Sequence, residues 1–491
     1  MAALLVAVLV VPLAAGVASW LLPTDRLRYL LVLPTTLLTL GLALALIAGV
    51  LQHGALRAFN DWLYLDHLGA VVLLVVALVS TMAGLYSVAY FRSTANAHAV
   101  RAGEMRKYFA LFHLFVFTMV TATVSGNLGL LWMAVTATTF AAAPLVDFYG
   151  SHGPLEAAWK FIILAVAGEL IALFGFLCLY ASAVGWLGGS YNFTVPVLQS
   201  VGPHLSPALG TLGFLLVLVG FGTKAGLAPM HTWLPDAHSQ APAPICAMLS
   251  GAELNCAMLA ILRVLALVTP AERGGTELRA ALLAFGLLSM TVGAVFLISQ
   301  RDFKRLLAYS SVEQMGLITA GIGLGAPLAV FGALLQMLAH SLAKCLMFFN
   351  AGNLLLRFRS TTISDVRGVV RVAPMTAVLV VAGALAIAGA PPFGLFLSEA
   401  SIISGGFGAG AGAAAGFIAV LLVVGFIALV APFSRMVFGE GRAGPLPPRA
   451  ELGAAVLLPG YVLLAAVLLL GVFVPGPLHA LLAGAAREVR G

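Results

Sequence analysis

Charged side chains are scarce in this chain, and long polar stretches are absent. Only 9% of the 491 residues are charged, whereas 62% are hydrophobic and the mean hydropathy is +1.08. Ordinary soluble domains carry about 25% charged residues, so a soluble protein is excluded. The longest polar connections between apolar runs reach about twenty residues, which leaves no room for a separate soluble domain.

Motifs for nucleotides, redox centres and metals are also missing. The sequence has no Walker loop, no G-x-G-x-x-G after a strand pattern and no C-x-x-C-H. Its basic residues give a net charge of +7 but form no run that would bind nucleic acid. The four cysteines lie inside apolar runs without C-x-x-C spacing, which indicates packing. Haem ligation by His113 and His340 has no other feature to support it. We therefore expect no cofactor, no metal, no nucleic-acid partner and no catalytic site of its own.

Apolar runs long enough to cross a bilayer follow one another from end to end. A transmembrane helix needs about 20 apolar residues. The first run has no basic segment before it, so we interpret it as a span and not as a signal peptide. We predict an all-α integral membrane protein with about 14 transmembrane helices. The predicted spans are 1–22, 28–51, 67–91, 108–124, 127–148, 157–185, 208–228, 241–268, 278–299, 304–325, 327–355, 374–403, 411–438 and 452–475.

Basic residues gather in the loops after odd-numbered spans. These loops contain Arg26, Arg28, Arg92, Arg101, Arg106, Lys107, Arg301, Lys304, Arg305, Arg357, Arg359, Arg367, Arg371, Arg435, Arg442 and Arg449. The other side has Arg57, Arg263, Arg273 and Arg279, plus Arg487 and Arg490 at the tail. Because positively charged loops stay in the cytoplasm, we predict a multi-pass membrane protein with both termini on the outer face.

Two predicted spans are interrupted by proline. Pro229 breaks the seventh span, and Pro391 with Pro392 breaks the twelfth. Each broken span is the fourth in a block of five, spans 4 to 8 and spans 9 to 13. Five is odd, so the second block is inverted relative to the first, as in transporters built from inverted repeats. The predicted division of the chain is 1–106 for spans 1 to 3, 107–270 and 271–440 for the two repeats, and 441–491 for span 14 and a tail.

Ionisable residues recur where the sequence should lie inside the hydrocarbon. Each costs about 3 kcal/mol on insertion scales unless it is paired or hydrated, so a static structural role for all of them is disfavoured. Acids alternating with bases and a histidine suit stepwise proton transfer, and we interpret the set as a proton pathway. Its predicted members are Glu169, Lys224, Glu253, Glu313, His340, Lys344 and Glu399, with His231 just after the first break.

Hydroxyl side chains are also frequent in the fourth and fifth spans. The fifth carries Thr136, Thr138 and Thr139 within one turn. Such hydroxyls usually bond the carbonyl one turn earlier in their own helix, so plain helix packing is the favoured interpretation.

Several long motifs resemble one known family. They are GFGTKAGLAPMHTWLPDAH, RDFKRLLAYSSVEQMG, HSLAKCLMFF and APPFGLFLSE, and they occur in the expected order. The resemblance is to the antiporter-like subunits of respiratory complex I, Mrp-type cation/proton antiporters and membrane-bound nickel-iron hydrogenases, and it is strongest to the hydrogenase-4 component F type. It covers the fourth to twelfth spans. It implies a fold of fourteen core helices with two inverted repeats of five, and a buried charged axis that relays protons and is coupled to redox chemistry in neighbouring subunits. It also implies a location in the prokaryotic cytoplasmic (inner) membrane.

The resemblance assigns roles to individual residues. It implies that Lys224 is the lysine of the first broken helix, that Glu399 is the acid of the second, and that His340 and Lys344 connect the two halves. One departure stands out: in NLGLLWMAVTATTF the family has a glutamate that pairs with the broken-helix lysine, and here that position is Thr136.

Two explanations of this departure remain open. Glu169 or Glu253 has taken over as the counter-ion of Lys224, which is our prediction, or the first half-channel is inactive.

Three functions follow in order of preference. The first is a proton-translocating subunit, with sodium ions as the alternative cargo, of a hydrogenase-4-like or complex I-like redox complex that contains further membrane subunits. The second is a module of a Mrp-like antiporter, and the third is a membrane scaffold that has lost ion conduction.

Overall fold

The computed structural model describes residues 1–93, 103–271, 275–440 and 450–490. Four of the loop arginines named above, Arg101, Arg273, Arg442 and Arg449, lie outside the described residues. The first part of the chain forms α1 (Ala2–Leu21), α2 (Asp25–His53), β1 (Leu56–Ala58), β2 (Leu63–Leu65), α3 (His67–Arg92), α4 (Glu104–Val124), α5 (Leu128–Val146), α6 (His152–Leu187), α7 (Val195–Ser200), a 3₁₀ turn η1 (Gly202–His204), α8 (Pro207–Lys224) and α9 (Trp233–Gln240).

The remainder is helical in all its regular elements. They are α10 (Ala243–Met248), a π-helical turn η2 (Leu249–Glu253), α11 (Leu254–Val268), α12 (Thr276–Ile298), α13 (Phe303–Leu324), α14 (Pro327–Phe358), α15 (Val369–Val372), α16 (Pro374–Ile387), α17 (Gly394–Gly408), α18 (Gly412–Phe438), α19 (Ala454–Val472) and α20 (Gly476–Arg490). The fold is thus nearly all α, as predicted, with one short antiparallel pair of strands among the described residues.

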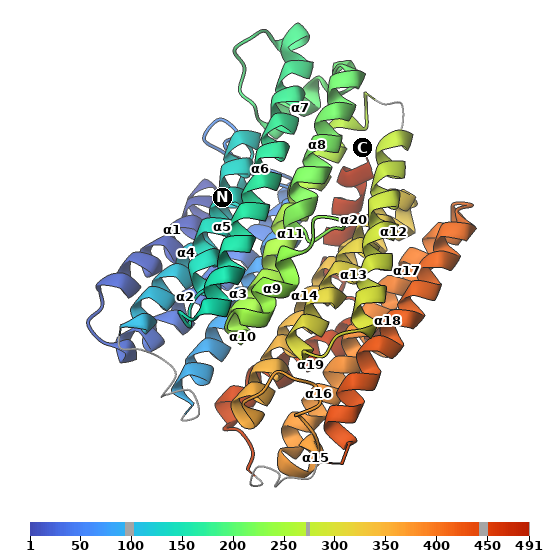
Figure 1. Cartoon of the computed structure of the whole chain (residues 1–491). Coiled ribbons are helices and arrows are strands. Elements are labelled where there is room, and N and C mark those ends of the chain that lie inside the picture. The colour runs from blue at the N-terminus through green and yellow to red at the C-terminus, as the bar shows by residue number, and fades with distance from the viewer. Residues whose placement is uncertain (94–102, 272–274, 441–449, 491) are drawn as a thin grey trace.

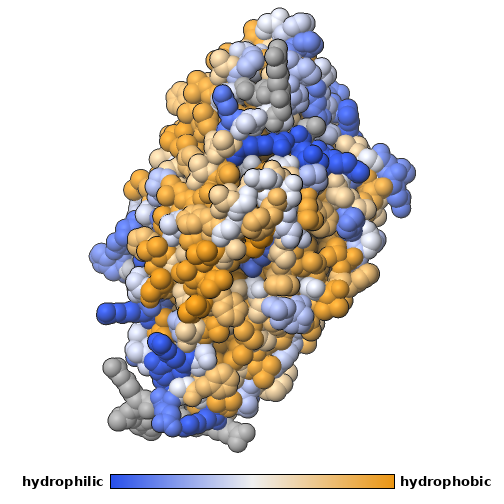
Figure 2. Space-filling view, turned by 90° about the vertical axis from the view of Figure 1, so that its right-hand side faces the viewer, coloured by the Kyte–Doolittle hydropathy of each residue, from blue (hydrophilic) through white to orange (hydrophobic). Residues whose placement is uncertain are grey.

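The helices form a membrane bundle. Twelve helices in the described ranges are long and apolar enough to cross a membrane. The two further predicted spans, 304–325 and 374–403, form α13 and the pair α16 and α17. Figure 2 shows apolar side chains gathered over the middle of one face, with hydrophilic groups toward its upper and lower ends. This distribution fits a bilayer around the middle of the bundle.

The centre of the bundle is formed by α3, α13, α14 and the segment from α10 to α11, and α13 is buried at every residue except Arg305 and Leu324. The apolar windows of Ala243–Val268 and of α14 are 100% and 94% buried, whereas that of α18 is 28% buried. The helix α3 is also largely enclosed, and it packs against both α14 and the α10–η2 segment. Figure 1 shows the blue α1, α2 and α4 to one side and the orange α17 and α18 to the other. Side chains on α11 and α14 are therefore the most shielded from lipid.

Both predicted helix breaks are present. The chain leaves helical conformation after Lys224 and resumes it at Trp233, with Pro229 between them. It leaves it again after Ile387 and resumes it at Gly394, with Pro391 and Pro392 between them. The inverted relation between the two blocks of five spans, and the division of the chain at 106, 270 and 440, stay predictions.

The C-terminal segment differs from the expected tail. Residues 476–490 form α20, which packs on α3 and α14. Its Glu488 accepts hydrogen bonds from the first backbone N–H groups of α3, those of His67 and Leu68, at 3.2 and 2.9 Å. Both chain ends lie toward the upper end of the bundle in Figure 1, whereas α15 lies at the lower end.

One arginine of the predicted outer side is buried inside the bundle. Arg263 belongs to α11 and is 3% exposed, and its guanidinium pairs with the carboxylate of Asp66, which itself accepts from the N–H of Gly69 in α3. A buried charge needs such a partner, because an unpaired one costs several kcal/mol. Arg263 therefore ties α11 to the start of α3.

Candidate functional site

Lys224 is the last residue of α8, and its ammonium group lies between two buried carboxylates. Its Nζ atom is 2.9 Å from Oε1 of Glu169 on α6 and 3.1 Å from Oε1 of Glu253 on η2. All three side chains are at most 1% exposed. The ring centroid of Phe161 lies 5.8 Å from the same nitrogen. The structure thus places both acids that the sequence offered as counter-ions beside Lys224. We call Lys224, Glu169 and Glu253 the first charge cluster.

Close packing of α6 against α8 brings Glu169 to Lys224. A Cβ atom on Gly168 would lie 2.6 Å from the carbonyl oxygen of Gly220, and a Cβ on Gly220 would in turn clash with the backbone of Gly168. Small residues at facing positions let two membrane helices approach closely. Because Glu169 directly follows Gly168, its short reach to α8 follows from this contact.

Two threonines of α5 complete the first charge cluster. Thr139 donates to Oε1 of Glu169 at 2.6 Å and accepts a hydrogen bond from Lys224, and Thr138 donates to Oε1 of Glu253 at 2.9 Å. The interpretation of these hydroxyls as plain packing is therefore wrong for Thr139, whereas the hydroxyl of Thr138 also lies 2.7 Å from the carbonyl oxygen of Val135 in its own helix, as that interpretation expects. The hydroxyl of Thr136, at the family's glutamate position, has no hydrogen-bond partner among the described residues.

The π-helical turn η2 carries polar groups toward the second half of the bundle. Glu253 is its last residue, and Ser250 in the same turn lies 2.7 Å, Oγ to Oγ, from Ser311 on α13. Just beyond, Asn255 donates from Nδ2 to Oγ of Ser341 on α14 at 2.9 Å. Single π turns inside α-helices are frequent at functional sites. This one links the first charge cluster to α13 and α14.

Lys344 occupies the middle of α14 and makes contacts of a different kind. Its Nζ donates to the carbonyl oxygen of Leu307 at 2.5 Å and to the hydroxyl of Ser310, both on α13. One turn earlier on the same face, His340 is completely buried, and neither of its ring nitrogens has a partner among the described residues. Lys344 is thus held by neutral oxygens and not by a carboxylate.

Glu399 on α17 lies at the end of a short chain of polar side chains. Gln314 on α13 donates from Nε2 to its Oε1 at 3.4 Å. Gln314 in turn accepts from Gln336 on α14, which accepts from Ser398. Gln314 and Ser398 were not predicted as site residues, although each stands next to a predicted acid in the sequence. Adjacency to an acid does not predict a shared site, because neighbouring residues on a helix point in different directions. The sequence contained no other signal for Gln314 and Ser398.

Glu313 stands apart from the other acids. Its carboxyl group is buried, and both oxygens lack a hydrogen-bond partner within the described part of the chain. The space for it exists because α18 has Gly425 at the point of contact, where a Cβ atom would overlap the carboxyl group. Glu313 is thus enclosed by neighbouring helices, and none of the described residues gives it a hydrogen bond.

The remaining predicted residue, His231, lies in the first break and packs against aromatic rings. Its ring centroid is 6.4 Å from that of Phe296 and 6.1 Å from that of Tyr309. The structure does not bring it into the first charge cluster.

Asp236 on α9 forms ion pairs with Lys160 from α6 at 3.1 Å and with Arg305 from α13 at 2.6 Å. These exposed ion pairs join the two halves of the bundle.

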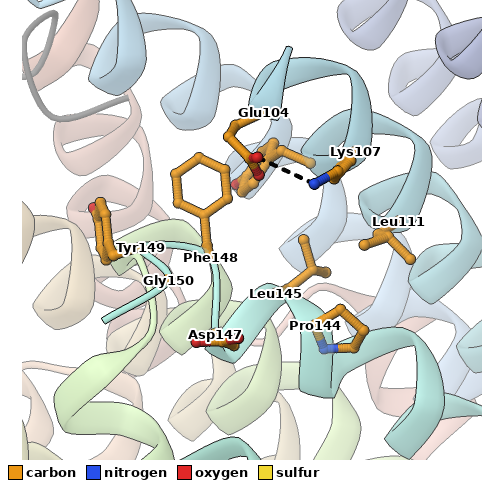
Figure 3. Close-up of a pocket in the computed structure, with 10 residues that line it drawn as sticks. Glu104, Lys107, Leu111, Pro144, Leu145, Asp147, Phe148, Tyr149 and Gly150 are labelled. Atoms are coloured by element: carbon orange, nitrogen blue, oxygen red, sulfur yellow. Dashed lines mark hydrogen bonds and ion pairs between the residues drawn. The ribbon is translucent and has the colours of Figure 1, made fainter. Parts of the chain in front are cut away.

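A pocket of about 300 Å³ opens between the start of α4 and the end of α5 (Figure 3). Glu104 and Lys107 pair across 3.1 Å on one side of it. On the other side Asp147 has one carboxyl oxygen without a partner among the described residues, and partial burial raises its pKa. Asp147 follows Thr139 by eight residues, about 12 Å of helical rise, so the pocket is separate from the first charge cluster.

Metal and cofactor ligands do not gather anywhere in the described ranges. They contain no group of three or more His, Cys, Asp or Glu side chains that could hold a metal ion. The four cysteines are free thiols, and three of them are buried.

Comparison with known proteins identifies the family. Residues 125–425 match the family described as NADH:quinone oxidoreductase/Mrp antiporter, transmembrane. The chain is 36% identical over 421 residues to a hydrogenase-4 component F homolog of Methylacidiphilum infernorum, covering 85% of this chain and 86% of that protein. It is 31% identical over 426 residues to NADH-quinone oxidoreductase subunit N of Desulforudis audaxviator, covering 84% and 82%.

Solved structures agree with this assignment. A chain of the archaeal membrane-bound sulfane sulfur reductase superposes with a TM-score of 0.84 at 25% identity, covering 99% of this chain and 97% of that one. A chain of the Mrp complex from Dietzia sp. superposes with a TM-score of 0.85 at 22% identity, covering 100% and 99%, which shows the shared fold. The resemblance seen in the sequence motifs is confirmed. The protein is a multi-pass, antiporter-like membrane subunit that belongs to the NADH:quinone oxidoreductase/Mrp antiporter family.

Proposed function

We propose that this chain relays protons through the membrane along its buried polar residues, as part of a hydrogenase-4-like or complex I-like redox complex. The observation that carries the proposal is the first charge cluster, in which one lysine is shared by two carboxylates. With all three ionised the group has a net charge of −1. One added proton makes it neutral, so the cluster has a natural place for a proton that arrives and leaves.

Each of the two carboxylates has an oxygen atom available for that proton. Each uses Oε1 for Lys224 and for a threonine, and each has an Oε2 atom without a partner among the described residues. A proton bound at Oε2 leaves the contacts at Oε1 in place. Moving Lys224 toward one acid raises the proton affinity of the other, which is how a conformational step could drive transfer.

Polar contacts extend from this cluster into the second half. Ser250, three residues before Glu253, bonds Ser311, and its neighbour Ser310 bonds Lys344. On α14 the side chains at successive i+4 steps, Gln336, His340 and Lys344, share one face. Gln336 then leads through Gln314 to Glu399. This order of contacts supports a route from Lys224 across α14 to Glu399.

The scaffold alternative rests on the missing glutamate at Thr136. It loses its main argument because Lys224 keeps two carboxylate partners without that glutamate. Replacing a whole group of buried charges by apolar residues costs little stability, whereas removing one member leaves an unpaired buried charge. An inactive half-channel therefore has no structural reason to contain a buried lysine and two buried acids.

The partners follow from the relatives. One is a hydrogenase-4 component F homolog, another is a subunit of an NADH-quinone oxidoreductase, and the structural neighbours are chains of multisubunit membrane complexes. We propose that this chain assembles with further membrane subunits and with a redox module that drives it, and that both its termini face outward. A place in a Mrp-like antiporter without redox chemistry is the alternative.

The experiment is proton uptake by proteoliposomes containing the complex purified through a tag on this chain. Glu169→Gln and Glu253→Gln should each lower the initial rate by about tenfold or more, because a positioned proton-transfer group contributes about 10²–10⁴-fold. Glu156→Gln is the matched control, since Glu156 lies on the same helix but pairs with Lys160 at the surface. Wild-type rates in both variants would refute the proposal. Sodium uptake in place of proton uptake would change the ion, and co-purifying subunits without redox centres would favour the antiporter alternative.

A further inference from the structure

A groove of about 930 Å³ runs along the outside of the bundle between α2, α3 and α19. The helix α3 forms its floor, because it packs against both α2 and α19. Leu30 and Leu33 of α2 and Leu458 and Val462 of α19 form the walls. The volume lies within the range of about 300–1,000 Å³ that is typical of ligand sites.

The groove is charged at one end only. Arg26 and Arg92 line the end where α2 begins and α3 finishes, and the rest of the lining is almost entirely apolar. On α3 the lining runs from Arg92 back to Met82, which is about 15 Å of helical rise. The hydrocarbon core of a bilayer is about 30 Å thick, so the groove reaches from the charged end through about one leaflet.

The two arginines at the mouth have no counter-ion among the described residues. Both side chains are exposed, and neither makes an ion pair within the described residues. The segments 94–102 and 441–449, outside the described residues, contain no Asp or Glu in the sequence. Arg28 on the same helix is different, because Asp25 at 2.5 Å and the carbonyl oxygen of Ser19 at 2.9 Å satisfy it. Arg92 is held over the ring of Tyr29 at 5.9 Å, at the mouth of the groove.

We propose that this groove binds one anionic phospholipid, with its phosphate between Arg26 and Arg92 and an acyl chain along α3. Apolar walls of one-leaflet depth fit an acyl chain, and two unpaired guanidinium groups fit a phosphate, which arginine binds in a bidentate manner. Basic pockets between membrane helices on the cytoplasmic side are typical sites for anionic head groups. Arg26 and Arg92 belong to the loops predicted to face the cytoplasm. The proposal is independent of the proton pathway.

The test uses the purified full-length chain in detergent with photoactivatable phosphatidylglycerol and, in parallel, phosphatidylethanolamine carrying the same acyl probe. Labelled peptides are then identified by mass spectrometry. We expect phosphatidylglycerol to label peptides containing residues 26–33 or 82–92 in preference to phosphatidylethanolamine. Arg26→Gln with Arg92→Gln should weaken that labelling by about 25-fold, at about fivefold for each charge near the membrane surface.

Two further variants make the test specific. Ala455→Trp fills the groove from an exposed position and leaves both arginines in place, so it should also abolish labelling by phosphatidylglycerol. Arg301→Gln removes an exposed arginine outside the groove and should label like the wild type. Equal labelling by the two lipids, undiminished labelling in the double arginine variant, or a helix of another subunit cross-linked into the groove of the assembled complex would overturn the proposal.

Discussion

The two halves of the bundle stabilise their buried ionisable side chains in different ways. In the first half, Lys224 is within 3.1 Å of two carboxylates, and threonines satisfy the same oxygens. In the second half, Lys344 contacts a carbonyl and a hydroxyl, Glu399 contacts an amide, and Glu313 and His340 have no polar partner among the described residues. Opposite charges are paired in the first half and separated in the second.

This difference indicates which half can keep its side chains ionised in the conformation seen here. An ion pair with extra hydrogen bonds repays much of its desolvation, whereas a lone buried charge costs several kcal/mol. The first half can therefore stay ionised in the arrangement seen here. Charged states of the second half need a counter-charge or a movement. A proton delivered along α14 is the event that would supply such a change.

The largest expected difference is between the two lysines. Lys224→Met leaves two buried carboxylates without their cation and should lower the free energy of unfolding by about 3–5 kcal/mol. Lys344→Met breaks two hydrogen bonds to neutral groups and leaves no contacting ion behind, so its loss should be about 1–2 kcal/mol. Unfolding of the chain in detergent by heat or denaturant measures both. Lys160→Met, at an exposed site, is the control, and equal losses for Lys224 and Lys344 would contradict the contrast.

An effect of opposite sign is expected at two acids. Glu313→Leu removes two oxygens that have no partner and keeps a similar volume, so stability should rise by about 1 kcal/mol or stay level. Glu169→Leu removes a partner of Lys224 and of Thr139 and should lower stability by about 2–3 kcal/mol. The same unfolding measurement compares them. A marked loss in Glu313→Leu would reveal a partner of Glu313 and weaken the distinction between the halves.

The sequence alone identified most of the buried ionisable residues but not their contacts. Lys224, Glu169 and Glu253 were each identifiable because a charge inside an apolar run is rare. Their meeting could not be predicted, because it depends on how closely α6 approaches α8 at Gly168 and Gly220. For the same reason Thr138 and Thr139 resembled ordinary helix hydroxyls. Only tertiary packing decides whether a hydroxyl bonds its own helix or a neighbouring carboxylate.

The C-terminal helix escaped prediction for another reason. Residues 476–490 are too short and too polar for a span, with Arg487, Glu488 and Arg490 near the end. The helix α20 buries one face on α3 and α14, and Glu488 bonds the N-terminal amides of α3. Its buried residues, which include Leu481, Leu482, Ala485 and Val489, follow helical spacing, so the sequence does carry an amphipathic pattern, but a search for apolar spans does not detect it.

A smaller effect is expected from the hydroxyl that links the charges of the first half. Thr139→Val keeps the shape of the side chain and removes its hydrogen bonds with Glu169 and Lys224. Stability should fall by about 1–2 kcal/mol, and the initial rate of proton uptake should fall with it, because the carboxylate loses the group that fixes its orientation. Thr121→Val is the matched control, since among the described residues that hydroxyl bonds only the carbonyl oxygen of Phe117 in its own helix at 2.7 Å. An unchanged uptake rate in Thr139→Val would remove the hydroxyl from the mechanism.

The smallest effect is expected at the position where the family has its glutamate. The hydroxyl of Thr136 has no partner in the described part of the chain, so Thr136→Ala should change stability by less than about 0.5 kcal/mol and leave proton uptake at the wild-type rate. Thr136→Ser, which keeps the hydroxyl, is the control and should behave identically. Proton uptake by proteoliposomes with each variant decides the matter. A strong loss in Thr136→Ala alone would mean that this hydroxyl still serves Lys224 in a state of the cycle other than the one seen here, and that the counter-ion role is not confined to Glu169 and Glu253.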